Sequence, residues 1–457
     1  MRYKLATLLV IGLIVRMLCV GYYIENFDTH RGEGNGQWTH KIADGDAFKY
    51  FREGVLIKES VDSGTPFFSV PVVKYYLYPR LIAAYGIFTG NLGYGERGVA
   101  LGQVGGFLYL QAVFSIACAV LFLWAISLVV CRAALVPIAL FLLFEPSMIQ
   151  LPCELMTESI FMGLIMICVS LWVFGWEASR RWISLPCFAA LGAMLVAVFL
   201  QRPAGLLLPI VFVVANMFWL RSRSARKVVC ATLVFLSVFI AGMSVYGEFN
   251  SRTSGHFYVM PLNARSDLLE ETAAPVWAER YNNPDAFDMF MARCRVEAIA
   301  NGVIPKDGPL NVEQKAALGD IHTKFAIAIF LKHPILTLKR ITIKMMKCTM
   351  IIPLKTHNRA FLGSQSGIGN YYAKEEMRYT NRVWTALILV PFFVGVVLQW
   401  VYGGAHAFNV LLVGLVAYFP ITCGWIGDPR YTLSNLCVYA VYWGLTVTFF
   451  RRLLSDA

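Results

Sequence analysis

Acidic side chains that follow the first apolar segment are the first residues of this sequence suited to chemistry. Asp44 and Asp46 lie in Ala43-Asp44-Gly45-Asp46-Ala47, about twenty residues beyond that segment. A carboxylate at this point can be the N-cap of a short helix or a general base held near a membrane surface. The spacing alone leaves both interpretations open.

Three further acids, Glu145, Glu154 and Glu158, lie close together between apolar segments. Glu154 and Glu158 are four residues apart, which predicts that they share one face of a helix. Because carboxylates near hydrocarbon are costly, an idle role is disfavoured. We expect these acids to position an acceptor, a cation or the preceding loop, with helix capping as the alternative.

Two arginines stand at the ends of apolar segments, Arg202 in Gln201-Arg202-Pro203 and Arg430 in Pro429-Arg430-Tyr431. Snorkelling of a long side chain to the membrane surface is one explanation for each. Both, however, lie on the side where membrane topology does not favour positive charge. Guanidinium groups that face the same compartment as the acids indicate a bound phosphate, because that pair is charge-assisted.

The elements that must position these residues are membrane spans. The chain has 457 residues, 58% of them hydrophobic and 15% charged, and its mean hydropathy is +0.59, whereas soluble domains contain about 25% charged residues. About ten apolar runs approach the length that crosses a bilayer. They are 5–23, 105–130, 133–148, 159–174, 182–200, 204–220, 228–246, 383–401, 405–422 and 431–450.

The net charge of +12 marks topology rather than nucleic-acid binding, because the basic residues cluster between alternate spans. With an even number of spans, both termini are cytoplasmic and the two long polar loops are exterior. The predicted division is a first transmembrane helix (1–23), a first exterior loop (24–103), transmembrane helices 2–7 (104–247), a second exterior loop (248–382), and transmembrane helices 8–10 with a cytoplasmic tail (383–457). No N-x-S/T site occurs, which favours a bacterial inner membrane.

Both exterior loops contain helical patterns. In the first loop, residues 44–60 and 71–88 predict short helices on the membrane surface. In the second, a cap signal at Asn311 starts a helix that ends near Leu331, and Pro334 opens another over 335–352. We expect this last helix to lie in the interface, because Lys344 and three other cations make a spanning role costly. There Lys344 would meet lipid headgroups or a lipid-linked phosphate.

Five short motifs, in order along the chain, resemble those of the GT-C integral membrane glycosyltransferases. Asp46-Ala47-Phe48-Lys49-Tyr50 resembles the D-x-x-x-Y element of their first exterior loop, and Tyr78-Pro79-Arg80-Leu81 resembles the L-Y-P-x-L segment after it. The others are Thr157-Glu158, Arg202-Pro203 and Arg430-Tyr431. The similarity is nearest to the protein O-mannosyltransferase and lipid A aminoarabinose transferase branch. Many relatives have Asp-Glu where this chain has Asp46-Ala47, so a second acid must come from Asp44 or elsewhere.

The resemblance implies an all-α polytopic fold and an inverting glycosyltransferase. Such an enzyme moves a sugar from a polyprenyl-phosphate carrier to a hydroxyl of a glycan, lipid or protein on the extracytoplasmic face. The implied roles are Asp46 as base, Asp44 or Glu158 as the group that orients acceptor or base, Arg202, Arg430 and Lys344 at the donor phosphate, and Tyr50, Tyr78, Glu154 and Tyr431 in substrate positioning. No cofactor is required by this chemistry; a divalent metal ion between Asp44, Asp46 and Glu158 stays open.

Three other classes compete with this interpretation. A lipid or solute transporter also places charges near spans, but the matching broken helices expected of one are missing from the sequence pattern. An O-antigen ligase or polymerase would use a pyrophosphate-linked donor, and the early acidic element favours a lipid monophosphate instead. A structural scaffold does not explain why the charges gather on the exterior side.

Overall fold

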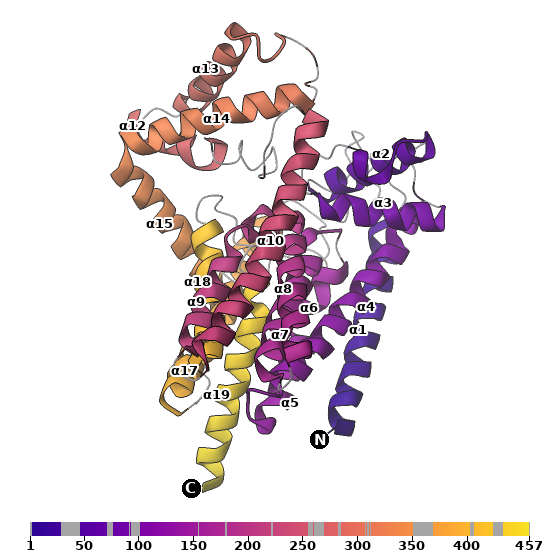
Figure 1. Cartoon of the computed structure of the whole chain (residues 1–457), viewed down its shortest axis with the longest axis vertical. Helices are drawn as coiled ribbons and strands as arrows, with labels where there is room; N and C mark the ends of the chain where they lie inside the picture. Colours follow the sequence, from indigo (N-terminus) through magenta and orange to yellow (C-terminus); the bar gives the residue numbers. More distant parts are fainter. Residues whose placement is uncertain are drawn as a thin grey trace.

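Long apolar helices form a bundle in the computed structural model of the chain, and both termini lie at the same end of it (Figure 1). The structure describes residues 2–28, 46–70, 76–90, 92, 101–153, 155–178, 181–220, 223–254, 259, 269–281, 285–306, 308, 310, 312–350, 369–402, 406–423 and 433–456. No β-strand occurs within these ranges.

Seven described helices are long and apolar enough to cross a membrane. They are α1 (Arg2–Asp28), α4 (Leu101–Ile126), α7 (Thr157–Glu177), α8 (Arg181–Gln201), α10 (Ala225–Ser254), α17 (Gly369–Tyr402) and α19 (Leu436–Asp456). A bent pair, α5 (Leu135–Phe144) with α6 (Pro146–Gln150), makes a further span if counted as one, and α9 (Leu208–Trp219) and α18 (His406–Cys423) are shorter apolar helices. The predicted runs all fall on these helices, so the chain is an all-α polytopic membrane protein.

The run predicted as one span over 133–148 is broken, with a bend of 53° between its two halves. Pro146 has no backbone N–H and cannot continue the helix hydrogen bonds, and Glu145 caps α6 by accepting a hydrogen bond from the Met148 N–H at 2.8 Å. Arg16 of α1 donates to the carbonyls of Leu142 and Leu143 at 2.9 and 3.0 Å. The break is therefore stabilised by side chains on both sides.

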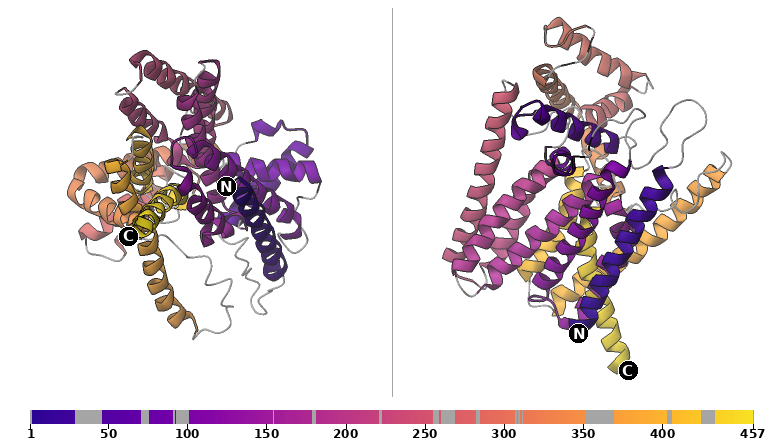
Figure 2. Two further views of the ribbon diagram at one scale, coloured as in Figure 1. Left: turned by 90° about the horizontal axis from the view of Figure 1, so that it is seen from below. Right: turned by 90° about the vertical axis from the view of Figure 1, so that its right-hand side faces the viewer.

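A cap of short helices covers the end of the bundle opposite to the termini (Figure 2). It contains α2 (Asp46–Asp62), the short η1 (Phe67–Ser69) and α3 (Leu77–Thr89). Gly54 lets α2 and α3 cross closely, because a Cβ there would stand 2.8 Å from Ile82. The helices predicted over 44–60 and 71–88 correspond to α2 and α3, and residues 44, 45 and 71–75 lie outside the described residues.

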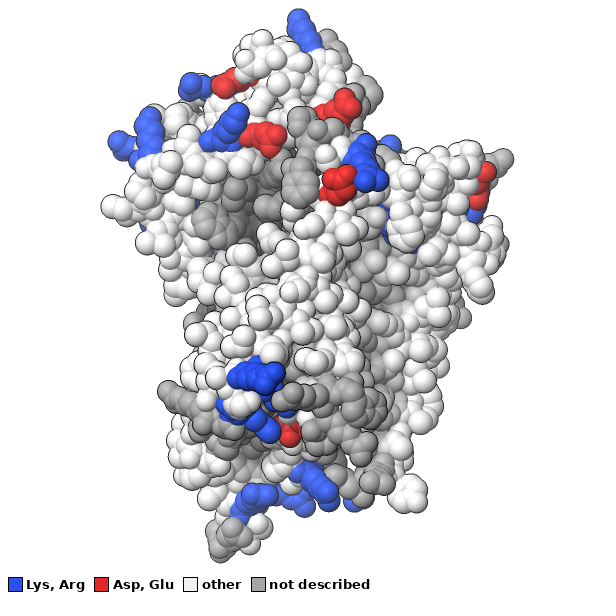
Figure 3. Space-filling model, viewed as in Figure 1, with Lys and Arg blue, Asp and Glu red and all other residues white. Residues whose placement is uncertain are grey.

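A second helical lobe stands at the same end. It consists of η5 (Leu269–Ala273), α12 (Ala274–Tyr281), α13 (Ala286–Ala300), α14 (Val312–Lys332) and α15 (Pro334–Met350). Its own apolar core includes Leu269, Phe290, Cys294, Ala326 and Ile329. In Figure 3 the charged residues gather at the two ends of the molecule, and the apolar middle carries almost none. That band is the surface that the hydrocarbon of a bilayer would cover.

Two cations of the helix predicted over 335–352 are paired within the protein, and the placement of this helix in the membrane interface stays a prediction. Lys339 and Arg340 of α15 both pair with Glu279 of α12, at 2.8 and 2.6 Å. The helix runs obliquely from the lobe to α18 (Figure 1). These two cations therefore form ion pairs within the lobe. The sequence pattern did not reveal that Glu279 would be their partner.

Candidate functional site

A buried ion pair between Glu158 and Arg202 is the centre of the candidate site. The Arg202 Nη2 donates to Glu158 Oε1 at 3.1 Å, and the two residues are only 3% and 2% exposed. Thr157 Oγ1 donates to the other carboxylate oxygen at 3.3 Å. Gln201 Nε2 donates to the Thr157 carbonyl at 3.2 Å, so the ends of α7 and α8 are joined twice.

Local sequence explains why each charge stands where it does. Glu158 lies in the first turn of α7, where the positive end of the helix dipole favours a carboxylate. Arg202 follows the last residue of α8 and has an extended backbone, with φ −152° and ψ 131°. The next residue, Pro203, disfavours a helical conformation for Arg202. The helix therefore ends there and turns the guanidinium toward α7.

The predicted helical face shared by Glu154 and Glu158 was wrong. Helix α7 begins at Thr157, after Met156 in an extended conformation (φ −130°, ψ 148°). The preceding short helix η3 ends at Cys153. Position 154 is therefore not part of α7, and Glu154 itself lies outside the described residues. The spacing predicted a shared face because neither Leu155 nor Met156 is a helix-breaking residue that would mark the non-helical link.

A chain of polar contacts joins the first loop to the same region. Tyr78 of α3 donates its hydroxyl hydrogen bond to Gln111 Oε1 of α4 at 2.8 Å. Gln111 Nε2 in turn donates to the Pro152 carbonyl at 3.3 Å, six residues before Glu158. Tyr50 of α2 packs edge-on against Tyr78, with ring centroids 5.4 Å apart. The first loop is thus locked to the segment that precedes α7.

Tyr50 and Tyr78 are both buried, with exposures of 1% and 0%. Neither tyrosine ring therefore lies on an open surface that a substrate would touch. The geometry is that of residues that hold α2 and α3 on the bundle. Their predicted contact with substrate stays a prediction. The packing of Tyr50 on Tyr78 and the hydrogen bond from Tyr78 to Gln111 support an indirect, positioning role.

Arg80, also in the Tyr78-Pro79 segment, is the strongest anchor of this cap. Its Nη2 donates to the Val70 carbonyl at 2.6 Å, and its guanidinium lies 3.7 Å from the centre of the Tyr76 ring. Burial lowers the pKa of this guanidinium from its ordinary value, and the neighbouring Tyr76 opposes that change. The sequence pattern predicted that Arg80 lies on an interfacial helix. In the structure the Arg80 side chain instead joins α3 to Val70, the residue that follows η1.

The structure describes the remaining predicted site residues only in part. Asp46 is the first residue of α2, and the structure describes its backbone but not its side chain. Lys344 is half-buried on α15, the helix that packs against α18. The other three, Asp44, Arg430 and Tyr431, lie outside the described residues.

A metal site is not visible among the described side chains. No group of three or more His, Cys, Asp and Glu in that part of the chain could hold an ion. The predicted candidate, Asp44 with Asp46 and Glu158, includes only one described side chain. The expectation of a divalent metal therefore stays a prediction.

Gln111 and Gln201 are site residues that the sequence reasoning missed. Each carries an amide inside or at the end of a long apolar run. A buried amide needs hydrogen-bond partners, so such a residue marks a contact between helices. That signal was available in the sequence, but it names no partner.

Comparisons with known proteins were made on both sequence and structure. No family model and no curated protein matches the sequence. In structure, the chain is similar to the archaeal oligosaccharyltransferase AglB from Archaeoglobus fulgidus, solved in complex with an inhibitory peptide and a dolichol-phosphate. The TM-score is 0.55 and the identity is 13%. That match covers 100% of this chain and 52% of AglB, so the chain spans about half the length of that protein.

A weaker similarity was found to ArnT from Cupriavidus metallidurans bound to undecaprenyl phosphate, with a TM-score of 0.39 and 14% identity. It covers 92% of this chain and 77% of ArnT. The similarity to AglB, in contrast, extends along the whole of this chain. The chain therefore shares the polytopic helical fold of AglB.

Proposed function

We propose that the chain is an inverting glycosyltransferase that moves a sugar from a polyprenyl-phosphate carrier to a hydroxyl acceptor. The observation that carries this proposal is the buried Glu158–Arg202 pair, at the end of the bundle that also bears α2, α3 and the helical lobe. The fold shared with AglB, which was solved with a dolichol-phosphate, supports a carrier of this kind.

The chemistry needs few protein groups. The acceptor oxygen attacks the anomeric carbon of the sugar. The bond between that carbon and the oxygen of the carrier phosphate breaks, and the phosphate leaves with the bonding electron pair. A lipid phosphate leaves as a stable anion, so no acid has to protonate it. The hydroxyl proton must go to a base, and cations must stabilise the developing charge on the phosphate.

Asp46 is the base in this proposal. It begins α2, and a helix N-terminus stabilises a carboxylate in its charged, proton-accepting form. Helix α2 is tied to the bundle through Tyr50 and Tyr78, which supports a fixed position for its first turn. Asp44 or Glu158 would orient the acceptor or the base.

Arg202 is the first cation at the donor phosphate, and Glu158 positions it. A guanidinium has five N–H donors in a planar fork, so a bond to a carboxylate fixes its plane without using all of them. Arg430 and Lys344 complete the cradle in this proposal, and Glu154 and Tyr431 contact the acceptor. If a divalent metal takes part, Asp44, Asp46 and Glu158 would supply its oxygen ligands.

The distribution of charge supports the proposed orientation of the site. The end that carries both termini also bears Lys4, Arg132, Arg226, Arg451 and Arg452, and cytoplasmic loops of membrane proteins are enriched in Lys and Arg. The cap and lobe would then face the extracytoplasmic side of a bacterial inner membrane. The acceptor there is a glycan, a lipid or a protein.

Lipid analysis of cells that lack the chain tests this function. Loss of the transferase should cause its sugar-loaded carrier to accumulate, and mass spectrometry of extracted lipids distinguishes a monophosphate from a pyrophosphate. We expect a polyprenyl monophosphate sugar that disappears when the wild-type gene is restored and persists with Asp46→Asn. Accumulation of a pyrophosphate-linked glycan would instead support a ligase or polymerase, and no accumulated donor would contradict the proposal.

A further inference from the structure

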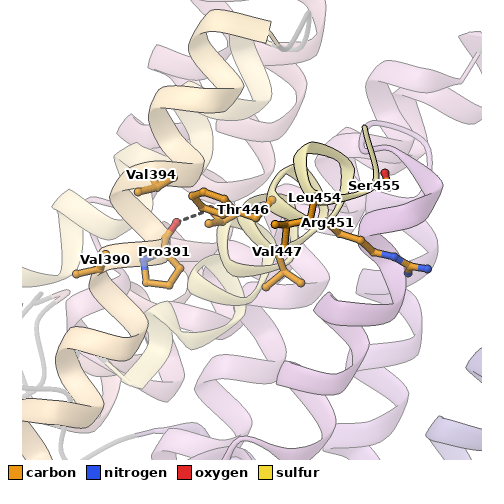
Figure 4. A pocket seen from close by; sticks show the side chains of 9 residues that line it. Val390, Pro391, Val394, Thr446, Val447, Arg451, Leu454 and Ser455 are labelled. Atoms are coloured by element: carbon orange, nitrogen blue, oxygen red, sulfur yellow. Dashed lines mark hydrogen bonds between the residues drawn. The ribbon is translucent and has the colours of Figure 1, made fainter. Parts of the chain in front are cut away.

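An apolar groove lies between α17 and α19 at the end of the bundle that carries the termini (Figure 4). Its volume is about 740 Å³. It is lined by Val390, Pro391, Val394, Thr446, Val447, Phe450, Arg451, Leu454 and Ser455. It lies away from the Glu158–Arg202 pair and takes no part in the proposed transfer.

The groove exists because the two helices touch closely on one side of it. A Cβ on Gly395 would stand 2.6 Å from the Tyr442 carbonyl oxygen, so only glycine permits this approach. Thr446 Oγ1 donates to the Pro391 carbonyl at 2.7 Å, a bond drawn in Figure 4. Beyond these contacts Val390 and Val394 of α17 are short side chains that leave a gap to α19.

The lining is apolar along its length and charged at one end. Thr446 and Ser455 use their hydroxyls within the protein, since Ser455 Oγ donates to the Arg452 carbonyl at 2.8 Å. Arg451 is the one charged residue of the lining. In Figure 4 its side chain extends from α19 away from the labelled residues of α17. Among the side chains that the structure describes, no carboxylate forms an ion pair with Arg451.

The surroundings of the groove are those of a surface that faces lipid. Val390 is 61% exposed, and Phe393 and Val397 on the same helix are also exposed. Water in such a groove would find almost no hydrogen-bond partners. An acyl chain, which is long, flexible and apolar, is the component of a bilayer that can fill it.

We propose that this groove binds one anionic phospholipid, with an acyl chain between α17 and α19 and its phosphate on Arg451. Charge complementarity selects the anionic lipid, because Arg451 is the one charged residue in the lining of an otherwise apolar groove. Basic pockets between transmembrane helices on the cytoplasmic side are a recognised form of anionic-lipid site. The lipid would hold α17 against α19 at the end farthest from the cap.

The proposed occupant comes from the leaflet opposite to the transferase site. The groove opens beside the C-terminus, whereas α2, α3 and the lobe lie at the other end of the bundle (Figures 1 and 2). A carrier lipid that binds at Arg202 therefore does not reach Arg451 from the same leaflet. The lipid site is independent of the donor site and of the proposed activity.

Native mass spectrometry of the delipidated full chain, titrated with phosphatidylglycerol or phosphatidylcholine of the same acyl chains, tests the proposal. We expect one phosphatidylglycerol to bind more tightly than phosphatidylcholine. Arg451→Gln should weaken it about fivefold, as one arginine near a membrane surface does. Val394→Phe, which narrows the groove, should weaken both lipids. Arg226→Gln removes an exposed arginine at the same end but outside the groove, and should change neither affinity.

Three results would overturn the proposal. The first is equal affinity for the two phospholipids, and the second is an unchanged phosphatidylglycerol affinity in both Arg451→Gln and Val394→Phe. The third is displacement of bound phosphatidylglycerol by equimolar undecaprenyl phosphate, which would assign the groove to a carrier lipid. Circular dichroism of each variant in detergent separates lost lipid binding from lost folding, because a folded variant keeps the helical signal.

Discussion

Arg202 donates to Glu158 at 3.1 Å across the ends of two helices, and neither side chain reaches solvent to any extent. A buried ion pair contributes little net stability, because the cost of removing two charges from water offsets their attraction. Its value lies in orientation, since the bond to Glu158 holds the plane of the Arg202 guanidinium. The pair is thus better understood as a device that fixes the Arg202 guanidinium.

Removing one partner of this pair should be costly. Arg202→Met leaves the Glu158 carboxylate buried without its cation, and we expect a loss of about 3–5 kcal/mol in the free energy of unfolding. The double variant Glu158→Gln with Arg202→Met should lose markedly less. Thermal unfolding in detergent micelles measures both. Glu248→Gln, which breaks the exposed pair with Arg252, is the control and should change nothing measurable; equal losses in the single and double variants would contradict this account.

Asp46→Asn separates a catalytic base from a helix cap. Asparagine caps helices about as well as aspartate, but it cannot accept the hydroxyl proton. We expect normal folding and donor binding, with sugar transfer slower by at least about a hundredfold. Transfer from the lipid carrier in nanodiscs is the measurement.

Asp62→Asn provides the matched control, since Asp62 ends the same helix and pairs with Lys58 on the surface. It should transfer sugar at the wild-type rate. Asp44→Asn should have a milder effect than Asp46→Asn. The reverse order would make Asp44 the base, and full activity in the Asp44, Asp46 double variant would remove both from the mechanism.

Topology can be checked with an impermeant thiol reagent on intact cells. Cysteines introduced as Asp62→Cys and Arg280→Cys lie on exposed residues of the cap and the lobe, and they should be labelled from outside. Arg223→Cys, at the other end of the bundle, should be labelled only after permeabilisation. The native Cys131 is exposed at that same end and reports membrane integrity. An Arg280→Cys that requires permeabilisation would reverse the orientation of the whole site.

The contact between α12 and α15 should weaken in acid. Hydrogen bonds from Lys339 and Arg340 lower the pKa of Glu279 below its ordinary value of 4.5. The folded lobe thus holds this proton less tightly than the unfolded chain does. The pair stabilises the lobe above about pH 4.5 and ceases to do so as the pH falls through the lowered folded-state pKa.

Hydrogen exchange of peptides from α15, corrected for intrinsic rates, measures this effect. Protection at pH 7 should exceed protection at pH 3, and Glu279→Gln should reduce protection at pH 7 toward the acid value. Glu313→Gln, on the exposed side of α14, should leave protection unchanged. If Glu279→Gln behaves like Glu313→Gln, the ion pair does not hold α15.

Close approach of α8 and α10 depends on Gly192. A Cβ at that position would stand 2.4 Å from the Phe235 carbonyl oxygen, which is backbone and cannot move aside alone. Alanine favours a helix over glycine by roughly 0.5–1 kcal/mol, but forced separation of packed helices costs about 1–3 kcal/mol. We therefore expect Gly192→Ala to lower the melting temperature. A raised melting temperature would mean that the helices separate without cost.

The sequence determined the elements that depend on local composition. Long apolar runs had to become spans, because backbone groups in hydrocarbon must bond within their own helix. Helices α14 and α15 were predicted within a few residues, since Pro334 is a strong local start signal. The break at Glu145-Pro146 was missed, although both residues were in view, because the flanking run is apolar enough to resemble one span.

Only the tertiary structure decided which polar groups meet. Glu158 and Arg202 were assigned separate roles from sequence, and α7 packing on α8 made them partners 44 residues apart. The cations of α15 were expected at the membrane interface, and one of them, Arg340, pairs with Glu279, 61 residues away. Periodicity and capping act over a few residues of chain, whereas these pairs form because buried charges must be satisfied by whichever group the packing of helices brings within reach.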